Sequence, residues 1–230
     1  MLIVFISKKN MKAIKVIEDN LVISETPVPL PRDDEVLIKV KAAGINRADI
    51  AQRKGLYPPP PGASEILGLE CSGIIESVGK NVSARQPGDE VMALLGGGGY
   101  GEYVTCPQFH TLYKPANLDW IEAASIPEVY ATCWLNLFME ASMKEGDKVV
   151  FHAGASGIGT AGIQLAKAFG CESFVSAGSK NKIDMCIDLG ASDGEVRSKD
   201  IFSKIKSWAP DGVDVLSLIH ISEPTRLNPI

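Results

Sequence analysis

The 230-residue chain has no excess of basic residues, since its formal net charge is −5. A nucleic-acid partner usually requires a basic face, so this charge argues against one. No apolar run is long enough to cross a bilayer. The short apolar start is followed at once by Lys8 and Lys9, which is unlike a secretory signal. The composition therefore predicts a soluble, cytoplasmic protein that binds neither nucleic acid nor membrane.

Paired cysteines are also missing. The chain has five cysteines, an odd number, and no two of them have C-x-x-C spacing. Disulfide frameworks and structural zinc sites depend on such pairs. We therefore predict reduced thiols and no structural zinc.

The pattern of expected strands and helices changes near residue 120. The earlier part holds a run rich in β-branched residues at 36–40 and further short strand candidates at 71–78 and 91–95. The later part alternates strands and helices: strands at 148–152, 173–177 and 213–216, and helices at 159–169, 180–189 and 201–208. This alternation is typical of βαβ units with a parallel sheet. We predict an α/β protein, with a β-domain at residues 11–120 and a partial Rossmann domain, a doubly wound parallel sheet, at 121–216.

A glycine-rich turn follows the strand at residues 148–152. It contains Gly154, Gly157 and Gly159, with Ile158 between the last two. Gly154 would allow a sharp turn, Gly157 a close approach of the backbone to a pyrophosphate, and Gly159 close helix–strand packing. The free N–H groups at the start of the following helix favour phosphate. A strand before the turn and a helix after it are the context that a dinucleotide site requires.

The next strand distinguishes between the two nicotinamide cofactors. An NAD site usually has an acidic residue about twenty residues beyond the glycines, which binds the ribose 2′-hydroxyl. Residues 177–182 hold no acid, but they include Ser179, Lys180 and Lys182. A hydroxyl and two cations suit a 2′-phosphate, to which an acid would be repulsive. We therefore predict NADPH as the cofactor.

Several motifs carry a family resemblance from about residue 11 to 215: Asn-Arg-Ala-Asp at 46–49, Pro-Pro-Pro-Gly-Ala at 59–63, Gly-Leu-Glu-Cys-Ser-Gly at 68–73, Pro-Gly-Asp at 87–89 and Ala-Ser-Ile-Pro-Glu at 124–128. With the glycine turn, they resemble the zinc-independent NADPH:quinone reductases of the medium-chain dehydrogenase/reductase superfamily. The p53-inducible quinone oxidoreductase subgroup is especially similar. The resemblance implies a GroES-like N-terminal domain, a Rossmann domain after it, and an active site between them.

The resemblance also implies roles for single residues. Tyr57 matches an active-site tyrosine near the nicotinamide, and Asn46 a polar residue of the same pocket. Ser156, Gly178 and Lys182 match positions that hold the phosphates. A family tyrosine near the adenine is replaced by Arg197, which could stack on the base or reach the phosphate. This departure leaves that contact open.

The same comparison predicts that no metal is bound. Zinc alcohol dehydrogenases of the superfamily have a cysteine where Asn46 stands and a histidine where Leu69 stands. Neither Asn46 nor Leu69 is a usual zinc ligand. The four-cysteine lobe of those relatives has no counterpart between Val78 and Gly88.

We therefore expect NADPH-dependent reduction of quinones by hydride transfer, with Tyr57 and Asn46 orienting the substrate carbonyl by hydrogen bonds. Reduction of a 2-enoyl thioester or an alkenal double bond is an alternative on the same fold. A non-catalytic NADPH-binding protein is a third possibility. The resemblance implies a homodimeric parent enzyme.

Both ends of the chain depart from the family. Met11 begins a natural entry into the first strand, so residues 1–10 are expected to be a non-native extension. The resemblance stops after Val215, and residues 217–230 are expected to be a non-native tail. The second half of the Rossmann domain would then be missing. We expect the chain by itself to be inactive, because its sheet would end in an unpaired edge.

Overall fold

The computed structural model describes residues 9–217. The chain divides between Glu128 and Val129 into two compact units, each described below by itself. The boundary lies inside helix α3 (Pro127–Cys133), later than the boundary at 120/121 that the sequence suggested. The expected extension and tail lie outside the described residues, apart from residues 9–10 and 217. Of these, Asn10 and Ser217 belong to strands.

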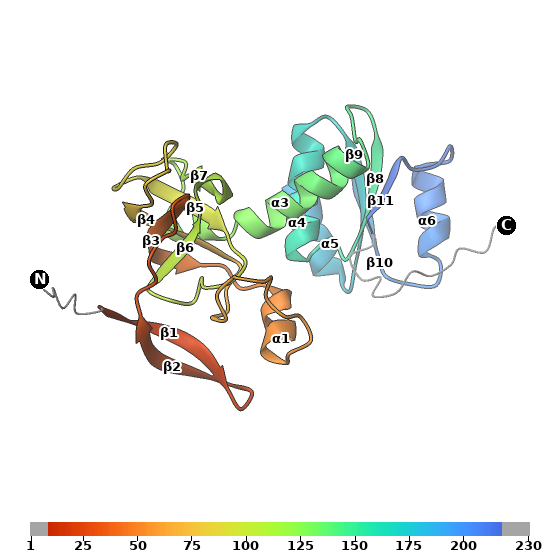
Figure 1. Cartoon of the computed structure of the whole chain (residues 1–230). Coiled ribbons are helices and arrows are strands. Elements are labelled where there is room, and N and C mark those ends of the chain that lie inside the picture. Colours follow the sequence, from red (N-terminus) through yellow and green to blue (C-terminus); the bar gives the residue numbers. More distant parts are fainter. Residues whose placement is uncertain (1–8, 218–230) are drawn as a thin grey trace, which may run out of the picture. The chain divides into compact units, whose positions relative to one another are not determined.

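The first unit is built on antiparallel strands (Figure 1). Strands β1 (Asn10–Ile17) and β2 (Asn20–Pro27) form a hairpin. The main sheet has the order β6-β3-β4-β5-β7. Its strands are β3 (Glu35–Ala43), β4 (Glu70–Val78), β5 (Glu90–Leu94), β6 (Tyr103–Pro107) and β7 (Thr111–Tyr113). Helices α1 (Arg47–Arg53) and α2 (Trp120–Ala124) and a 3-10 turn (Gln108–His110) complete the unit.

The core of this unit follows from alternation along β3. Val36 and Ile38 are fully buried among residues of β4, β5 and β6. Leu37, between them, points to the opposite face and packs with Met11 and Tyr103. Because successive side chains of a strand face opposite sides, this continuous apolar run serves two cores at once.

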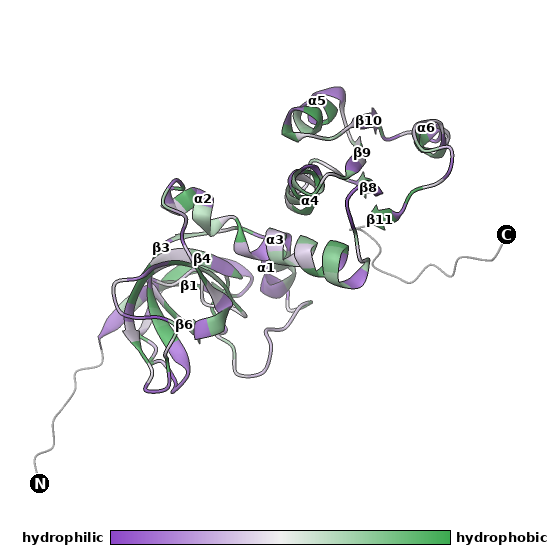
Figure 2. Cartoon of the chain, turned by 90° about the horizontal axis from the view of Figure 1, so that it is seen from above, coloured by the Kyte–Doolittle hydropathy of each residue, from purple (hydrophilic) through white to green (hydrophobic). Residues whose placement is uncertain are grey.

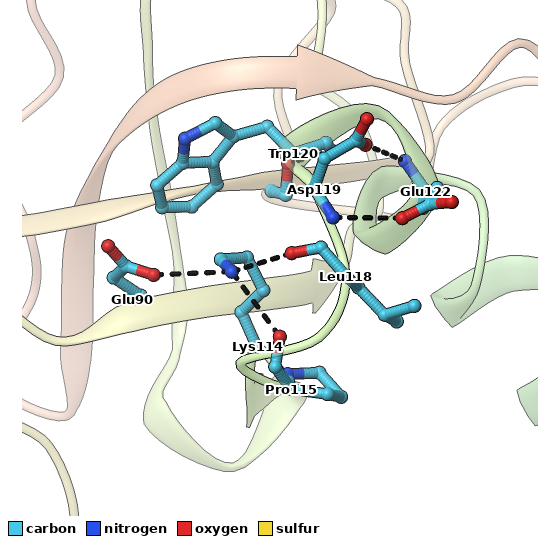
Figure 3. A network of polar contacts seen from close by, with 8 residues as sticks. Glu90, Lys114, Pro115, Leu118, Asp119, Trp120 and Glu122 are labelled. Carbon is cyan, nitrogen blue, oxygen red and sulfur yellow. Dashed lines mark hydrogen bonds and ion pairs between the residues drawn. The ribbon is translucent and has the colours of Figure 1, made fainter.

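A buried lysine ties the last strand of this unit to α2 (Figure 3). The Lys114 side chain is 8% exposed, and its Nζ lies 3.3 Å from Glu90 Oε2. It also donates to the carbonyl of Leu118 at 2.8 Å and lies 5.0 Å from the centre of the Trp120 ring. A buried ammonium is tolerated only when paired in this way. Lys114 therefore fixes the connection that leads to α2.

The second unit is a parallel sheet with the order β10-β9-β8-β11. The strands are β8 (Lys148–His152), β9 (Glu172–Ala177), β10 (Asp193–Val196) and β11 (Val215–Ser217). The helices are α4 (Gly157–Ala168), α5 (Lys180–Leu189) and α6 (Ile201–Trp208). A π-helix (Trp134–Glu140) continues directly from α3.

Helices cover both faces of this sheet, with α4 and α5 on one side and α6 on the other (Figure 2). Val149 and Phe151 of β8 pack in the cluster that contains α4 and α5, whereas Val150 packs with Ile201 of α6. The sequence of a strand that is covered on both faces is a nearly continuous apolar run, and residues 149–151 of β8 form such a run. The prediction of an α/β protein with a partial, doubly wound Rossmann domain is confirmed.

One strand of this sheet was missed. The sequence placed the third strand at 213–216, but β10 lies between α5 and α6 and pairs with β9. Its sequence, Asp-Gly-Glu-Val, has little β-propensity. Tertiary pairing with β9 therefore decides its conformation. Within residues 9–217, no helix is long and apolar enough to cross a membrane.

Candidate functional site

The glycine turn lies at the carboxyl ends of the parallel strands. Strands β8, β9 and β10 end at His152, Ala177 and Val196, and we call this side of the sheet the carboxyl edge. In open parallel sheets, ligands bind outside the carboxyl ends of the strands. The chain segments that leave these three strands hold all nine residues that the sequence assigned to the cofactor: Gly154, Ser156, Gly157, Ile158, Gly159, Gly178, Ser179, Lys182 and Arg197.

The structural role of Gly154 differs from the expected one, whereas that of Gly159 agrees with it. The sharp turn is made by Ala153, whose φ is +57°, and not by Gly154. A Cβ on Gly154 would lie 2.8 Å from Cβ of Val175, so Gly154 is required for packing against β9. A Cβ on Gly159 would collide with the Gly154 carbonyl, in agreement with the predicted close helix–strand packing.

The start of α4 leaves backbone donors free. Ser156 is the N-cap residue, and its Oγ accepts the N–H of Gly159 at 3.1 Å. Within residues 9–217, no backbone acceptor takes the N–H groups of Gly157 and Ile158. Gly157 is exposed, whereas the Ile158 side chain packs into the core. Ile158 can therefore contribute to a phosphate site only through its backbone.

The two lysines after β9 differ in their surroundings. Lys180 Nζ lies 2.7 Å from Asp184 Oδ1, one helical turn away. Lys182 is exposed and has no ion pair among the described residues. Ser179 is the N-cap residue of α5, but its side chain accepts no capping hydrogen bond. The sequence treated both lysines as equivalent, yet only Lys182 has an uncommitted charge.

Arg197 reaches the same edge from β10. Its backbone N–H donates to the carbonyl of Ala177 at 2.8 Å, which places it beside the end of β9. Burial lowers the pKa of His152, and the positive charge of Arg197 lowers it further. The His152 ring lies 2.8 Å from Ser176 Oγ. His152 is therefore an uncharged neighbour of the edge, whereas Arg197 supplies a second cation.

In the first unit, Asn46 belongs to a buried polar network. Its Nδ2 donates to Glu70 Oε1 at 2.8 Å, and its backbone N–H donates to Asp49 Oδ2 at 2.7 Å. Asp49 Oδ2 also accepts the Tyr100 hydroxyl at 2.7 Å. Glu70 Oε2 accepts the backbone N–H of Glu128 at 2.9 Å. We call these five residues the Glu70 network.

Carboxylates are concentrated in this network. Glu70 is 2% exposed and Asp49 is 5% exposed. Burial raises the pKa of Glu70, and the charge of Asp49 raises it further, while its two hydrogen bonds act in the opposite direction. Burial also raises the pKa of Glu128, with added repulsion from Glu70 and Asp49. Crowded, buried carboxyls of this kind favour retention of a proton.

Tyr57 is not part of the Glu70 network. It lies on the loop after α1, is 53% exposed, and makes no side-chain hydrogen bond among the described residues. Leu69 is buried, and no group of three or more metal-ligating side chains occurs within residues 9–217. The structure thus fixes Asn46 firmly and leaves the Tyr57 hydroxyl free.

The fold and these sites can be compared with known proteins. Residues 32–116 match the alcohol dehydrogenase GroES-like domain. Human quinone oxidoreductase is 34% identical over 84% of this chain and 60% of its own length. The zebrafish synaptic vesicle membrane protein VAT-1 homolog is 32% identical over 82% of this chain and 39% of its own length. This chain thus spans about 60% or less of the length of these curated relatives.

Solved structures give the same result. Quinone oxidoreductase from Coxiella burnetii matches with a TM-score of 0.75 and 31% identity, over 92% of this chain and 69% of that one. The chain is a quinone-oxidoreductase-like member of the medium-chain dehydrogenase/reductase superfamily. CurK enoyl reductase matches with a TM-score of 0.79 and 31% identity, over 90% of this chain and 66% of the other. A mycobacterial protein complexed with NADPH matches with a TM-score of 0.79 and 29% identity, over 90% of this chain and 66% of that one.

The sequence analysis missed the centre of the Glu70 network. Glu70 is this centre, because it joins Asn46 to the backbone of Glu128. The useful signal was an acidic residue at the start of strand β4, whose first four residues are all buried, since a buried carboxylate requires donors. The identity of its donors could not be read from the sequence, because they lie 24 and 58 residues away.

Proposed function

We propose that the carboxyl edge binds the phosphates of NADPH. The free N–H groups of Gly157 and Ile158 are suited to the pyrophosphate, because the helix dipole adds to their attraction for an anion. Ser179, Lys182 and Arg197 follow the neighbouring strands at the same edge and supply a hydroxyl and two cations for the 2′-phosphate. The observation that carries this proposal is that these donors have no acidic partner in the part of the chain that the structure describes.

The open surroundings of Gly178 support the same assignment. A Cβ built on Gly178 would meet nothing within 4 Å, so packing inside the protein does not require a glycine there. Close approach of a ligand is a separate reason for a glycine at such a position. The solved relative complexed with NADPH adds to the support.

The affinity for the two cofactors tests this assignment. We expect the chain to bind NADPH more tightly than NADH, and Lys182→Ala to reduce that preference by about tenfold, which corresponds to the loss of one charge-assisted hydrogen bond. Lys180→Ala is the matched control, because Lys180 is already paired with Asp184. The measurement is the dissociation constant of NADPH and of NADH, obtained from nucleotide fluorescence, for the unaltered chain and both variants. Equal affinities for NADPH and NADH in the unaltered chain would refute the proposal.

For the whole protein, we propose zinc-independent reduction of quinones. Bound NADPH would supply the hydride. Asn46 and Tyr57 would orient the substrate carbonyl, and the Tyr57 hydroxyl or solvent would deliver the proton. The quinone oxidoreductases among the relatives support this substrate class. Positioning accounts for most of the catalysis here, because a quinone is itself a good hydride acceptor.

A second candidate is reduction of a carbon–carbon double bond in an enoyl thioester or alkenal. It is favoured by the similarity to CurK enoyl reductase, which equals the similarity to the Coxiella burnetii enzyme in sequence identity. NADPH oxidation measured with an ortho-quinone, an alkenal and an enoyl thioester would separate the two. Binding of NADPH without oxidation by any acceptor would instead support a non-catalytic protein. Tyr57→Phe combined with Asn46→Ala should abolish quinone turnover if the assigned roles are correct.

A further inference from the structure

The two oxygens of Glu70 accept hydrogen bonds from donors of different kinds. Oε2 accepts the backbone N–H of Glu128, and Oε1 accepts the side-chain Nδ2 of Asn46. A backbone N–H can only donate, so Oε2 must remain an acceptor. A side-chain amide can offer either an N–H donor or an oxygen acceptor, depending on its orientation. Of the two contacts, only the one with Asn46 can therefore exchange its donor and its acceptor.

This difference determines where a proton on Glu70 would be held. A proton on Oε2 would face the Glu128 N–H and leave that donor without an acceptor. A proton on Oε1 would face Asn46, whose amide could rotate and accept it through Oδ1. The contacts of Glu70 thus have two arrangements in which both of its oxygens are satisfied, one for the carboxylate and one for the carboxylic acid. Asp49 Oδ1, which is buried without a partner among the described residues, takes part in neither.

The surroundings make both forms of Glu70 accessible. Its titratable neighbours are Asp49 on α1, Glu128 on α3, Tyr100 between β5 and β6, and Cys71 on β4. Burial raises the pKa of the Tyr100 hydroxyl and of the Cys71 thiol, so both stay protonated. Burial and Asp49 also raise the pKa of Glu70 above the usual range of a glutamate. Gly44 packs directly against the carboxylate, and a Cβ there would collide with Oε1.

We propose that Glu70 is a positioning residue that sets which end of the Asn46 amide is turned away from the network: Oδ1 when Glu70 is a carboxylate, and Nδ2 when it is a carboxylic acid. Its importance for catalysis rests on the proposed contact between Asn46 and a substrate carbonyl. With Glu70 as a carboxylate, one of the two Nδ2 hydrogens of Asn46 is bound to Oε1, whereas the acid form frees both. Because a carbonyl oxygen requires a donor, the acid form of Glu70 is the one that assists reduction more.

Glu70→Gln imitates the acid form. The Glu128 N–H selects the oxygen of the new side chain, so its NH₂ group faces Asn46 and requires Oδ1 there. The side-chain amide signals of Asn46 in ¹H–¹⁵N spectra of the full chain report its orientation, and Asn46→Ala identifies them by their loss. At high pH we expect slowly exchanging, shifted N–H signals, and at low pH the faster exchange that Glu70→Gln shows at every pH.

Glu76→Gln, an exposed change on the same strand, is the matched control and should titrate like the unaltered chain. An Asn46 amide that is unaffected by pH would overturn the proposal, even if Glu70→Gln failed to fold. The NADPH dissociation constant of the same samples keeps this result distinct from the proposed function. Loss of NADPH binding with a titrating amide would reject only the cofactor assignment. A static amide with intact NADPH binding would reject only the positioning role.

Discussion

The Glu70 network and the carboxyl edge use polar groups in opposite ways. In the network, the donors of Asn46, Tyr100 and the Glu128 backbone are all committed to buried carboxylates. At the carboxyl edge, the N–H groups of Gly157 and Ile158 and the ammonium of Lys182 have no acceptor among residues 9–217. Committed groups hold a geometry, whereas uncommitted groups can bind an anion. This contrast supports the two proposals, in which the Glu70 network positions Asn46 and the carboxyl edge binds the cofactor phosphates.

The largest expected effect comes from filling the space at Gly159. In Gly159→Ala, the new Cβ meets the backbone of Gly154, which cannot move without shifting the whole turn. We expect unfolding to become easier by about 3 kcal/mol and NADPH binding to be lost. Gly178→Ala is the control, because its Cβ meets nothing within 4 Å, and its stability should be unchanged. Equal denaturation midpoints for both variants would contradict the close packing at Gly159.

The next effect concerns the pH dependence of stability. A carboxyl whose pKa is raised in the folded state stabilises the fold while it is protonated. That contribution is complete below the unfolded value, 4.5, and is lost as the pH rises through the raised folded value of Glu70. We expect the unaltered chain to lose stability relative to Glu70→Gln over this window. Urea denaturation at several pH values would show it, and a stability difference between the two chains that stays constant over this window would contradict it.

Sequence periodicity predicted the apolar framework well. Strand β8 and helices α5 and α6 have the predicted bounds, because their apolar residues and caps are local signals. Strand β10 was missed, since its polar sequence is strand only through pairing with β9.

The two candidate sites differed in the same way. The glycines of the strand–helix turn and the lysines after the next strand were predicted from their spacing, and Ser156 from the family resemblance. The left-handed conformation of Ala153 and the pairing of Lys180 with Asp184 required the structure. The Glu70 network could not be predicted, because each of its hydrogen bonds through Glu70 joins residues far apart in the chain.

Ser156 tests the contribution of the helix cap at the carboxyl edge. Ser156→Ala removes the acceptor of the Gly159 N–H and should cost about 1 kcal/mol of stability. Ser156→Gly should cost only a few tenths of that amount, because glycine is tolerated at the N-cap position. If the Ser156 hydroxyl also donates to a phosphate, both variants should weaken NADPH binding to the same extent. Weaker binding in Ser156→Ala alone would mean that the serine acts only through the helix.

The smallest expected effect is at Ala153, where the open donors depend on a strained backbone. Its φ of +57° costs an alanine about 1–2 kcal/mol, which glycine would relieve. Glycine also adds about 0.4–1 kcal/mol of unfolded-state entropy, so the net stabilisation by Ala153→Gly should lie between zero and about 1.6 kcal/mol. Ser142→Gly, with a φ of +54° away from the turn, is the matched control. If Ala153 holds the N–H groups of Gly157 and Ile158 in place, only Ala153→Gly should weaken NADPH binding, by a few-fold. Unchanged binding in both variants would show that the free donors at the carboxyl edge do not depend on this strained residue, and that the edge, unlike the Glu70 network, needs no fixed geometry.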